Sequence, residues 1–160
     1  MPHGVRVVGN RLRFMSAHMA TWSGGAEPLH GHNYQVTAEM VGSVTEDSWV
    51  IDFSVLKRVV RERCESLDHR FLLQRESRVL AIEETDDAWR FRTPDGRCYH
   101  MPKSDVVALP VDNTTTERLA QWFHREIAGA LGAAGWRNLA ELRVEIEEAP
   151  GQSGWYAAPV

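Results

Sequence analysis

The sequence predicts an α+β fold in which a four-stranded antiparallel sheet is covered on one face by two helices. Three observations support this prediction. Segments near both ends of the chain alternate between apolar and polar residues, two segments between them repeat apolar residues at helical spacing, and a turn-rich segment separates these two. A length of 160 residues is typical of one domain. We therefore expect a single domain over residues 1–160, with strand order ββααββ and a hairpin inserted at about residues 75–110.

The first two strands are predicted from alternation. Residues 5–14 alternate loosely, and Gly9-Asn10 within them is typical of a bulge or bend. Residues 21–28 contain two glycines and a proline, which indicates a loop. Residues 33–41 alternate again, and their apolar side is formed by Tyr34, Val36, Ala38 and Met40. The two strands are therefore expected to pair, joined by a long loop.

The two helices are predicted from apolar spacing and from capping residues. The first opens at Asp52-Phe53-Ser54, where Asp52 or Ser54 is a candidate cap. Its apolar face repeats every 3.6 residues and comprises Val55, Leu56, Val59, Val60, Cys64 and Leu67. In the second helix, Thr114 and Glu117 have the spacing of a capping box. Its apolar face comprises Leu119, Ala120, Phe123, Ile127 and Leu131, and Gly132 and Gly135 are expected to end it.

The remaining segments complete the predicted fold. Residues 79–101 contain a Thr93-Pro94-Asp95-Gly96 turn between β-favouring residues, which predicts the inserted hairpin. Residues 142–146 and 154–157 supply the last two strands.

Composition excludes several classes of function. The net charge of −4 argues against nucleic acid as a partner, which requires a concentrated basic surface. No apolar run reaches the length of a membrane span, and the N-terminal residues lack the apolar core of a signal peptide. The two cysteines, Cys64 and Cys98, fall on a helical apolar face and in the hairpin, so neither indicates a disulfide framework. We therefore expect a cytoplasmic protein with no membrane partner.

Three histidines are candidate metal ligands. His30 and His32 project from the same face of a strand, because side chains repeat every two residues, and Gly31 between them leaves room beside the backbone. His18, twelve positions upstream, would complete a three-histidine set, which leaves a fourth coordination position open as in catalytic zinc sites. The alternative is a chance H-x-H pattern, which has little meaning alone.

Further residues are candidates for acid–base chemistry or binding. Asp68-His69 follows the first helix, where a carboxylate tunes the ring for proton transfer; the alternative is a histidine that complements the helix dipole. Glu148 ends a late strand and would accept hydrogen bonds from a bound ring, or else is a solvated surface acid. Glu27 lies three positions before His30, close enough to a metal ion to act as a general base, although a loop glutamate is normally just exposed.

Taken in order, these motifs resemble the family of 6-pyruvoyltetrahydropterin synthase and 6-carboxytetrahydropterin synthase, which has the tunnelling fold (T-fold). The resemblance covers nearly the whole chain. It rests on Phe14-x-Ser16-Ala17-His18, Leu29-His30-Gly31-His32-Asn33-Tyr34, Asp52-Phe53-x-x-Leu56-Lys57, Leu67-Asp68-His69, Asn113-Thr114-Thr115-Thr116-Glu117 and Glu148-Ala149-Pro150 with Tyr156 following. Six ordered motifs are far more specific than one H-x-H pattern.

The resemblance implies a role for each motif. Zinc would be held by the three histidines and would polarise the side chain of a dihydropterin substrate, while Asp68 and His69 would relay protons. Glu148 would anchor the pterin ring, with further ring contacts from Thr115 and Thr116. Family members assemble as trimers or dimers of trimers, in which the sheets close into a barrel and the active sites lie between subunits.

One departure from the family pattern concerns the reaction. The synthases carry a catalytic cysteine just before the H-G-H, whereas this chain has Glu27-Pro28-Leu29 there, similar to a subgroup that cleaves the side chain of 7,8-dihydroneopterin triphosphate to 6-hydroxymethyl-7,8-dihydropterin, a folate precursor. We therefore expect a zinc-dependent lyase. The alternatives are a 6-pyruvoyl- or 6-carboxytetrahydropterin synthase, a pterin-binding protein without activity, and a T-fold protein without zinc.

Overall fold

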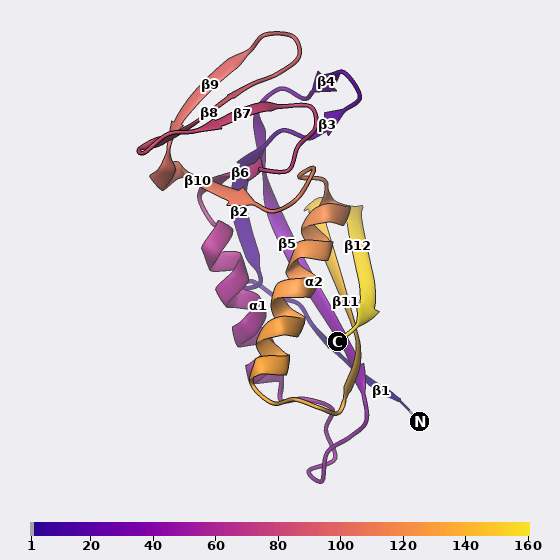
Figure 1. The fold of residues 1–160 in the computed structure, drawn as a ribbon. Coiled ribbons are helices and arrows are strands. Elements are labelled where there is room, and N and C mark those ends of the chain that lie inside the picture. The colour runs from indigo at the N-terminus through magenta and orange to yellow at the C-terminus, as the bar shows by residue number, and fades with distance from the viewer. Residues whose placement is uncertain (1) are drawn as a thin grey trace.

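The structure, a computed structural model, describes residues 2–160 and confirms the predicted fold class (Figure 1). Its main sheet has the strand order β10-β6-β2-β5-β11-β12, and β1 also pairs with β5. Four neighbouring strands, β2, β5, β11 and β12, form the predicted antiparallel set. The strands of the main sheet are β1 (His3–Val7), β2 (Arg13–His18), β5 (His30–Gly42), β6 (Arg70–Gln74), β10 (Val106–Leu109), β11 (Leu139–Ala149) and β12 (Gln152–Pro159).

The strand predicted over residues 5–14 is divided into β1 and β2. Both pair with β5, in registers that place His3 opposite Gly42 and His18 opposite His30. Between them the chain leaves the sheet in a tight turn, where the Leu12 amide donates to the Gly9 carbonyl. The predicted bend at Gly9-Asn10 is therefore the break between two strands. As a result, β5 is paired along nearly its whole length.

The helices α1 (Phe53–Leu67) and α2 (Thr116–Ala133) pack on the same face of the sheet (Figure 1). Asp52 caps α1: its carboxylate accepts from the Ser54 amide at 2.6 Å, and this contact lowers the pKa of Asp52. The capping box predicted for α2 is wrong in its first residue. Thr115, not Thr114, is the cap and accepts from the Arg118 amide at 3.4 Å. Thr114 is fully buried and bonds elsewhere.

The core lies between this sheet face and the helices. Phe14 stacks on Tyr34 with ring centroids 4.7 Å apart, and Phe123 of α2 stacks on Phe14 at 5.7 Å. The predicted apolar faces of both helices and of the alternating strands are buried here, apart from the half-buried Val55. The face of the sheet that the helices cover is thus fixed, and with it the direction in which every second residue of β2 and β5 points.

The insertion between the helices is larger than the predicted hairpin. It forms a three-stranded sheet of β7 (Ala81–Glu84), β8 (Ala88–Arg92) and β9 (Cys98–Pro102), followed by a short 3₁₀ turn (Lys103–Asp105). The strand β7 was not predicted, because the recognisable turn joins only β8 and β9. The inserted sheet lies next to a small hairpin, β3 (Thr21–Trp22) and β4 (Gly25–Ala26), within the predicted loop (Figure 1).

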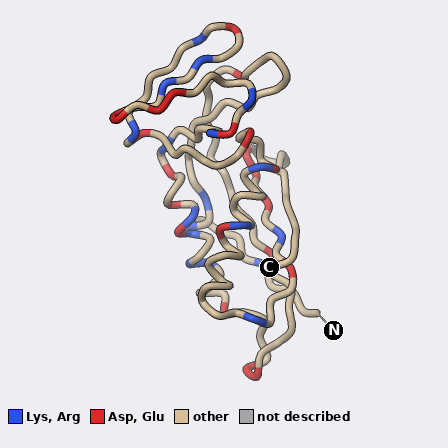
Figure 2. Tube along the Cα trace, viewed as in Figure 1, with Lys and Arg blue, Asp and Glu red and all other residues tan. Residues whose placement is uncertain are grey.

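Charged residues of both signs are interspersed over the helices and the inserted sheet (Figure 2). On α1, for example, Arg58 pairs with Glu62 at 3.4 Å and Arg61 with Glu65 at 3.8 Å, one helical turn apart. Neither cysteine among the described residues forms a disulfide: Cys64 is buried on α1 and Cys98 is exposed on β9. Over the same part of the chain, no helix is long and apolar enough to span a membrane.

Candidate metal centre

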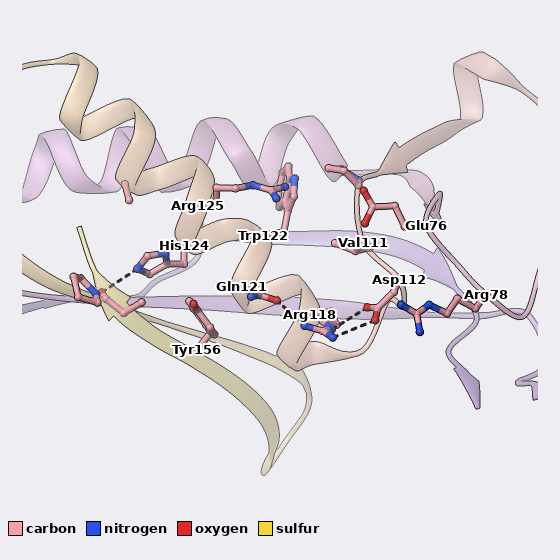
Figure 3. A pocket seen from close by; sticks show the side chains of 14 residues that line it. Glu76, Arg78, Val111, Asp112, Arg118, Gln121, Trp122, His124, Arg125 and Tyr156 are labelled. Carbon is pink, nitrogen blue, oxygen red and sulfur yellow. Dashed lines mark hydrogen bonds and ion pairs between the residues drawn. The ribbon is translucent and has the colours of Figure 1, made fainter. Parts of the chain in front are cut away.

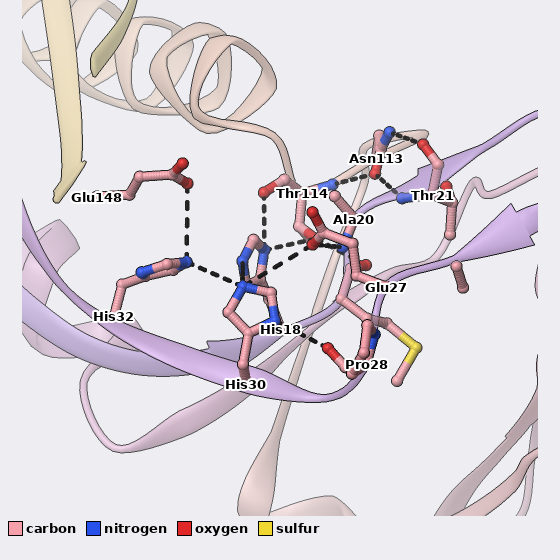
Figure 4. Close-up of polar contacts among 12 residues, drawn as sticks. His18, Ala20, Thr21, Glu27, Pro28, His30, His32, Asn113, Thr114 and Glu148 are labelled. Atoms are coloured by element: carbon pink, nitrogen blue, oxygen red, sulfur yellow. Dashed lines mark hydrogen bonds and ion pairs between the residues drawn. The ribbon is translucent and has the colours of Figure 1, made fainter. Parts of the chain in front are cut away.

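The three predicted ligands converge at one end of the sheet. His18 of β2 lies directly opposite His30 of β5, and His32 follows two residues later on the same face. The Nε2 atoms of His18 and His30 are 3.2 Å apart, and those of His30 and His32 are 3.0 Å apart (Figure 4). A side chain at Gly31 would place its Cβ 3.0 Å from the Ser16 carbonyl oxygen, so glycine permits the close approach of the two strands here.

Hydrogen bonds define which ring nitrogens face the centre. His18 Nδ1 lies 3.0 Å from the Thr114 carbonyl oxygen, and His30 Nδ1 lies 2.8 Å from the Pro28 carbonyl oxygen. A carbonyl can only accept, so in each neutral ring Nδ1 carries the proton and Nε2 presents a lone pair. Lone pairs that face one another at about 3 Å repel unless a cation lies between them.

The histidines therefore fit a metal ion. Tetrahedral coordination at the usual metal–nitrogen distance separates neighbouring nitrogens by about 3.3 Å, close to the separations observed here. One ligand atom from each of the three rings lies within 4.8 Å of the others. Carbonyl acceptors on the far ring nitrogens are typical of ligating histidines, because they fix the tautomer and the ring orientation.

His18 is the most buried of the three ligands, with only 2% of its surface exposed. Burial lowers its pKa from 6.5 to about 4, and neighbouring His30 and His32 act in the same direction. The imidazole is thus neutral at physiological pH, which is the form that binds a metal ion.

We expect acid to destabilise the metal-free protein through His18. Between pH 6.5 and about 4 the unfolded chain binds a proton at this residue that the folded chain does not. The free energy of unfolding is therefore greatest above this range. It decreases as the pH is lowered through the range, by at most about 3 kcal/mol. Urea unfolding of chelator-treated protein at about pH 7, 5.5 and 4.5 measures the decline. An equal decline in a His18→Gln variant would contradict the assignment to this histidine.

Glu27 flanks the histidines from the loop before β5. Its Oε2 lies 3.8 Å from His30 Nε2 and accepts from the Ala20 amide at 3.0 Å. The backbone of Glu27 also donates to the Ala20 carbonyl at 2.9 Å, so the same two residues close the β3–β4 hairpin twice. The carboxylate therefore lies beside one of the three candidate metal ligands. Its role as a base remains a prediction.

Glu148 flanks the histidines from the opposite side, with Oε2 3.8 Å from His32 Nε2 (Figure 4). The pairing of β11 with β12 shifts register here, because Glu147 faces Ser153 whereas Ala149 faces Gln152. Glu148 is the extra residue of this bulge. Bulges redirect side chains and are frequent beside active sites, which accounts for a half-buried carboxylate directed at the metal site.

The Asp68–His69 pair lies away from the histidine cluster. Asp68 Oδ2 lies 2.8 Å from His69 Nδ1, and its Oδ1 accepts from the Met15 amide at 2.8 Å. Burial alone would raise the pKa of Asp68, but the bonds from Met15 and His69 outweigh it and lower the pKa. The His69 ring is 70% exposed and its backbone has a φ of 58°, a conformation that costs energy for a residue with a side chain.

His69 of this pair borders a hollow of about 580 Å³. Most of its lining from β2 and β5 consists of residues that alternate with the candidate metal ligands, namely Met15, Ala17, Gly31 and Asn33, and His32 also contributes to its wall. Alternating side chains point to opposite faces of a sheet. Within residues 2–160, no hydrogen bond or ion pair links the predicted proton relay to the three candidate metal ligands.

The predicted ring contacts, Thr115 and Thr116, lie at the start of α2, close to the start of β12. Thr115 caps the helix, and a side chain at Gly154 of β12 would collide with Thr116. Thr114 was not predicted as a site residue, yet its hydroxyl lies 3.2 Å from His18 Nδ1 and 3.3 Å from the Met19 carbonyl oxygen. Its position in a capping pattern concealed this second role.

Replacing Thr114 with valine is expected to weaken metal binding by about tenfold. The variant keeps the backbone carbonyl that orients His18 and loses only the hydroxyl contact. The effect therefore falls at the low end of the range for residues that support a ligand. Competition with a fluorescent chelator measures the affinity, and an unchanged affinity would mean that the carbonyl alone orients the ring.

A further cavity of about 720 Å³ lies between α2, β12 and the chain before the inserted sheet (Figure 3). It is lined by basic and acidic side chains, and Arg118 within it pairs with Asp112 at 2.9 Å. None of the predicted catalytic, metal-binding or ring-binding residues lines it. The candidate site is accordingly the histidine cluster.

Comparisons with known proteins agree with this geometry. The family model described as 6-pyruvoyl tetrahydropterin synthase matches residues 8–159. Two archaeal proteins are each named "Putative 6-carboxy-5,6,7,8-tetrahydropterin synthase". The one from Methanocaldococcus jannaschii is 35% identical over 91% of this chain and 89% of its own length. The one from Pyrococcus horikoshii is 31% identical over 76% and 69%, respectively.

Solved structures give the same result. The 6-pyruvoyltetrahydropterin synthase of Plasmodium vivax has a TM-score of 0.94 and 31% identity, covering 100% of this chain and 99% of that one. A variant of that enzyme, described as a catalytic residue mutant, carries alanine in place of a glutamate and has a TM-score of 0.93 and 31% identity, with the same coverage. The family match and the fold agree over almost the full length, and the chain belongs to the 6-pyruvoyl tetrahydropterin synthase family of pterin enzymes.

Proposed function

We propose that this protein is a zinc-dependent lyase that cleaves the side chain of 7,8-dihydroneopterin triphosphate, or a related dihydropterin, to give 6-hydroxymethyl-7,8-dihydropterin. The observation that carries the proposal is the carboxylate of Glu27 beside the histidine cluster, 3.8 Å from His30. Both cysteines lie elsewhere: Cys64 is buried within α1, where burial raises its pKa to about 12, and Cys98 is exposed on the inserted sheet.

His18, His30 and His32 hold the metal in this proposal. When bound, zinc supplies Lewis-acid polarisation of the side-chain oxygens of the substrate. Three neutral imidazoles suit zinc but also copper, iron and nickel, and the open fourth position is typical of catalytic rather than structural zinc.

Glu27 is proposed as the general base of a retro-aldol cleavage. It accepts the proton from the hydroxyl on the second side-chain carbon, whose oxygen then forms a carbonyl as the bond to the first carbon breaks. The electron pair of that bond moves to the first carbon, next to the unsaturated pterin ring. A proton delivered there completes the hydroxymethyl group, and the remaining fragment leaves as an aldehyde. A carboxylate suits removal of a hydroxyl proton, whereas a synthase must remove a carbon-bound proton.

The Asp68–His69 pair is proposed to deliver that proton from a neighbouring subunit. Asp68 binds His69 Nδ1, so the other nitrogen of this exposed ring is directed outward for proton transfer. Its separation from the metal histidines within one chain supports an assembly in which active sites lie between subunits. We propose a homotrimer or a dimer of trimers in the cytoplasm, in which edge strands of adjacent sheets pair.

Glu148 is proposed to anchor the pterin ring. A carboxylate accepts hydrogen bonds from both an amino group and a ring N–H, a bidentate arrangement that fixes orientation as well as adding binding energy. Thr115 and Thr116 are proposed to contribute further ring contacts from the start of α2. The substrate would then lie between Glu148 and Glu27, which flank the histidines on opposite sides (Figure 4).

A second candidate, a pyruvoyl- or carboxytetrahydropterin synthase, is favoured by the names of the archaeal relatives. The glutamate described as catalytic in the Plasmodium vivax enzyme supports a family member that works through glutamate. Incubation of the zinc-loaded protein with dihydroneopterin triphosphate, followed by chromatography, separates these readings. Hydroxymethyldihydropterin supports the lyase. A pyruvoyl product with release of triphosphate would overturn it in favour of the synthase, and tight binding without any product would indicate a binding protein.

A further inference from the structure

The inserted sheet packs directly on the segment that carries Glu27. A second apolar cluster joins the two, separate from the main core. It comprises Met19, Ala26, Phe71, Leu73, Leu80, Trp89, Phe91 and Val106. Ala26, the residue before Glu27, is 8% exposed within this cluster. Because Ala26 packs in this cluster, the position of the Glu27 backbone depends on the inserted sheet.

Arg97 provides the polar part of this link. It lies in the turn between β8 and β9, and its guanidinium donates to the Ala26 carbonyl at 2.8 Å and to the Glu27 carbonyl at 3.1 Å. Two adjacent carbonyl oxygens match the rigid, forked donors of arginine, whereas a lysine ammonium lacks this geometry.

Arg97 is itself held in place from within the insertion. Its Nε lies 2.9 Å from Asp95 Oδ2, and its Nη1 lies 3.3 Å from the Tyr99 hydroxyl. The Tyr99 ring stacks on Phe91 with centroids 4.9 Å apart, and Phe91 stacks on Phe71 at 5.2 Å. A long side chain fixed at so many points loses little further freedom when it binds the loop.

These contacts fix three groups of Glu27. Its amide donates to the Ala20 carbonyl, its carboxylate accepts from the Ala20 amide, and its carbonyl accepts from Arg97. The first two contacts lie within the β3–β4 hairpin and move with it. Asn113 holds the other strand of this hairpin through two hydrogen bonds with Thr21, and Arg97 is the contact from the inserted sheet at Glu27 itself.

We propose that Arg97 is a positioning residue for the reaction and that the inserted sheet orients the Glu27 carboxylate through it. This inference rests on the proposed function of Glu27 as the base. Arg97 does not touch the histidines: its effect passes through the backbone of residues 26 and 27. Displacement of a catalytic group by about 1 Å lowers a rate by as much as a hundredfold.

The test compares Arg97→Ala, Arg97→Lys and Arg92→Ala. Arg92 is the matched control, because it is exposed on the same inserted sheet and its side chain has no hydrogen bond or ion pair with any residue between 2 and 160. We expect Arg97→Ala to lower kcat by about ten- to a hundredfold, with little change in KM, metal content or melting temperature. Arg97→Lys should fall between Arg97→Ala and the wild type, and Arg92→Ala should match the wild type.

A double-mutant cycle with Glu27→Ala distinguishes positioning of Glu27 from a general structural effect. If Arg97 acts through Glu27, Arg97→Ala should cause no further loss in the Glu27→Ala background. Amide hydrogen exchange at Glu27, whose N–H bonds to Ala20, should become faster in Arg97→Ala and remain unchanged in Arg92→Ala. If Arg97→Ala unfolds or loses its metal, Asp95→Asn replaces it, because it loosens the guanidinium and leaves the arginine in place.

The outcomes separate this inference from the function on which it rests. An inactive Glu27→Ala together with a fully active Arg97→Ala would overturn the positioning role alone. Equal losses from Arg97→Ala with and without Glu27 would also overturn it. A fully active Glu27→Ala would instead refute the role of Glu27 as the base, and with it the positioning role of Arg97.

Discussion

Replacing Glu27 with alanine is expected to lower kcat for side-chain cleavage by about 10²- to 10⁴-fold, the usual contribution of a positioned acid–base group. The metal should remain bound, because all three histidines and the carbonyl acceptors of His18 and His30 persist. The loss should therefore appear in kcat with KM little changed. Steady-state assay with dihydroneopterin triphosphate, alongside metal analysis of the same preparation, measures both quantities.

Two further variants at and away from this position sharpen the result. Glu46→Ala removes an exposed carboxylate from the loop between β5 and α1 and should leave kcat unchanged. Glu27→Cys places a thiol beside the histidines, and its different basicity and reach should divert part of the product from hydroxymethyl- to pyruvoyl-type compounds. Full activity in Glu27→Ala would exclude the carboxylate as the base.

The fold could be predicted where sequence periodicity reports burial. Both helices and the alternating strands bury one face against the core, so their apolar spacing is visible in the sequence. The strands β6 and β10 were missed because they lack this periodicity. Phe71, Leu72 and Leu73 are consecutive buried residues, and such a short apolar run has no period of two. The three-stranded insertion was reduced to a hairpin because only one of its two turns has a distinctive sequence.

The metal ligands of the candidate site could be predicted from the sequence, but the residues that hold the site residues in place could not. The H-x-H spacing directly encodes a shared face, and the structure brings His18 to the same place through pairing of β2 with β5. Thr114 and Arg97 leave no comparable signal, because they act through contacts 96 and 70 residues apart. The Asp68–His69 pair has a clear motif, yet the sequence does not reveal which face of the sheet it borders.

Replacing His30 with alanine is expected to abolish metal binding. His30 is the central member of the cluster, with Nε2 within 3.2 Å of both other ligands, so its removal leaves two rings that no longer surround one point. Affinity should fall by well over a hundredfold, since even residues that only support a ligand contribute ten- to a hundredfold. Activity should fall to background with it. His3→Ala, which removes an exposed histidine from β1, is the control and should retain the metal.

The same variant should remove the effect of a chelator on stability and change the order of stabilities between variant and wild type. In the wild type, metal at about a thousand times its Kd stabilises the folded state by about 4 kcal/mol, which chelation removes. What then remains is a cluster in which the Nε2 atom of His30 lies 3.2 Å from that of His18 and 3.0 Å from that of His32, without a cation between them. His30→Ala removes the central ring, and the side chain of His30 is 37% exposed, so little packing is lost. Metal-free His30→Ala should therefore be at least as stable as metal-free wild type, although the metal-loaded wild type exceeds both. Unfolding by urea with and without chelator tests this crossover. A His30→Ala variant that is markedly less stable than the metal-free wild type would mean that His30 serves the fold rather than the metal.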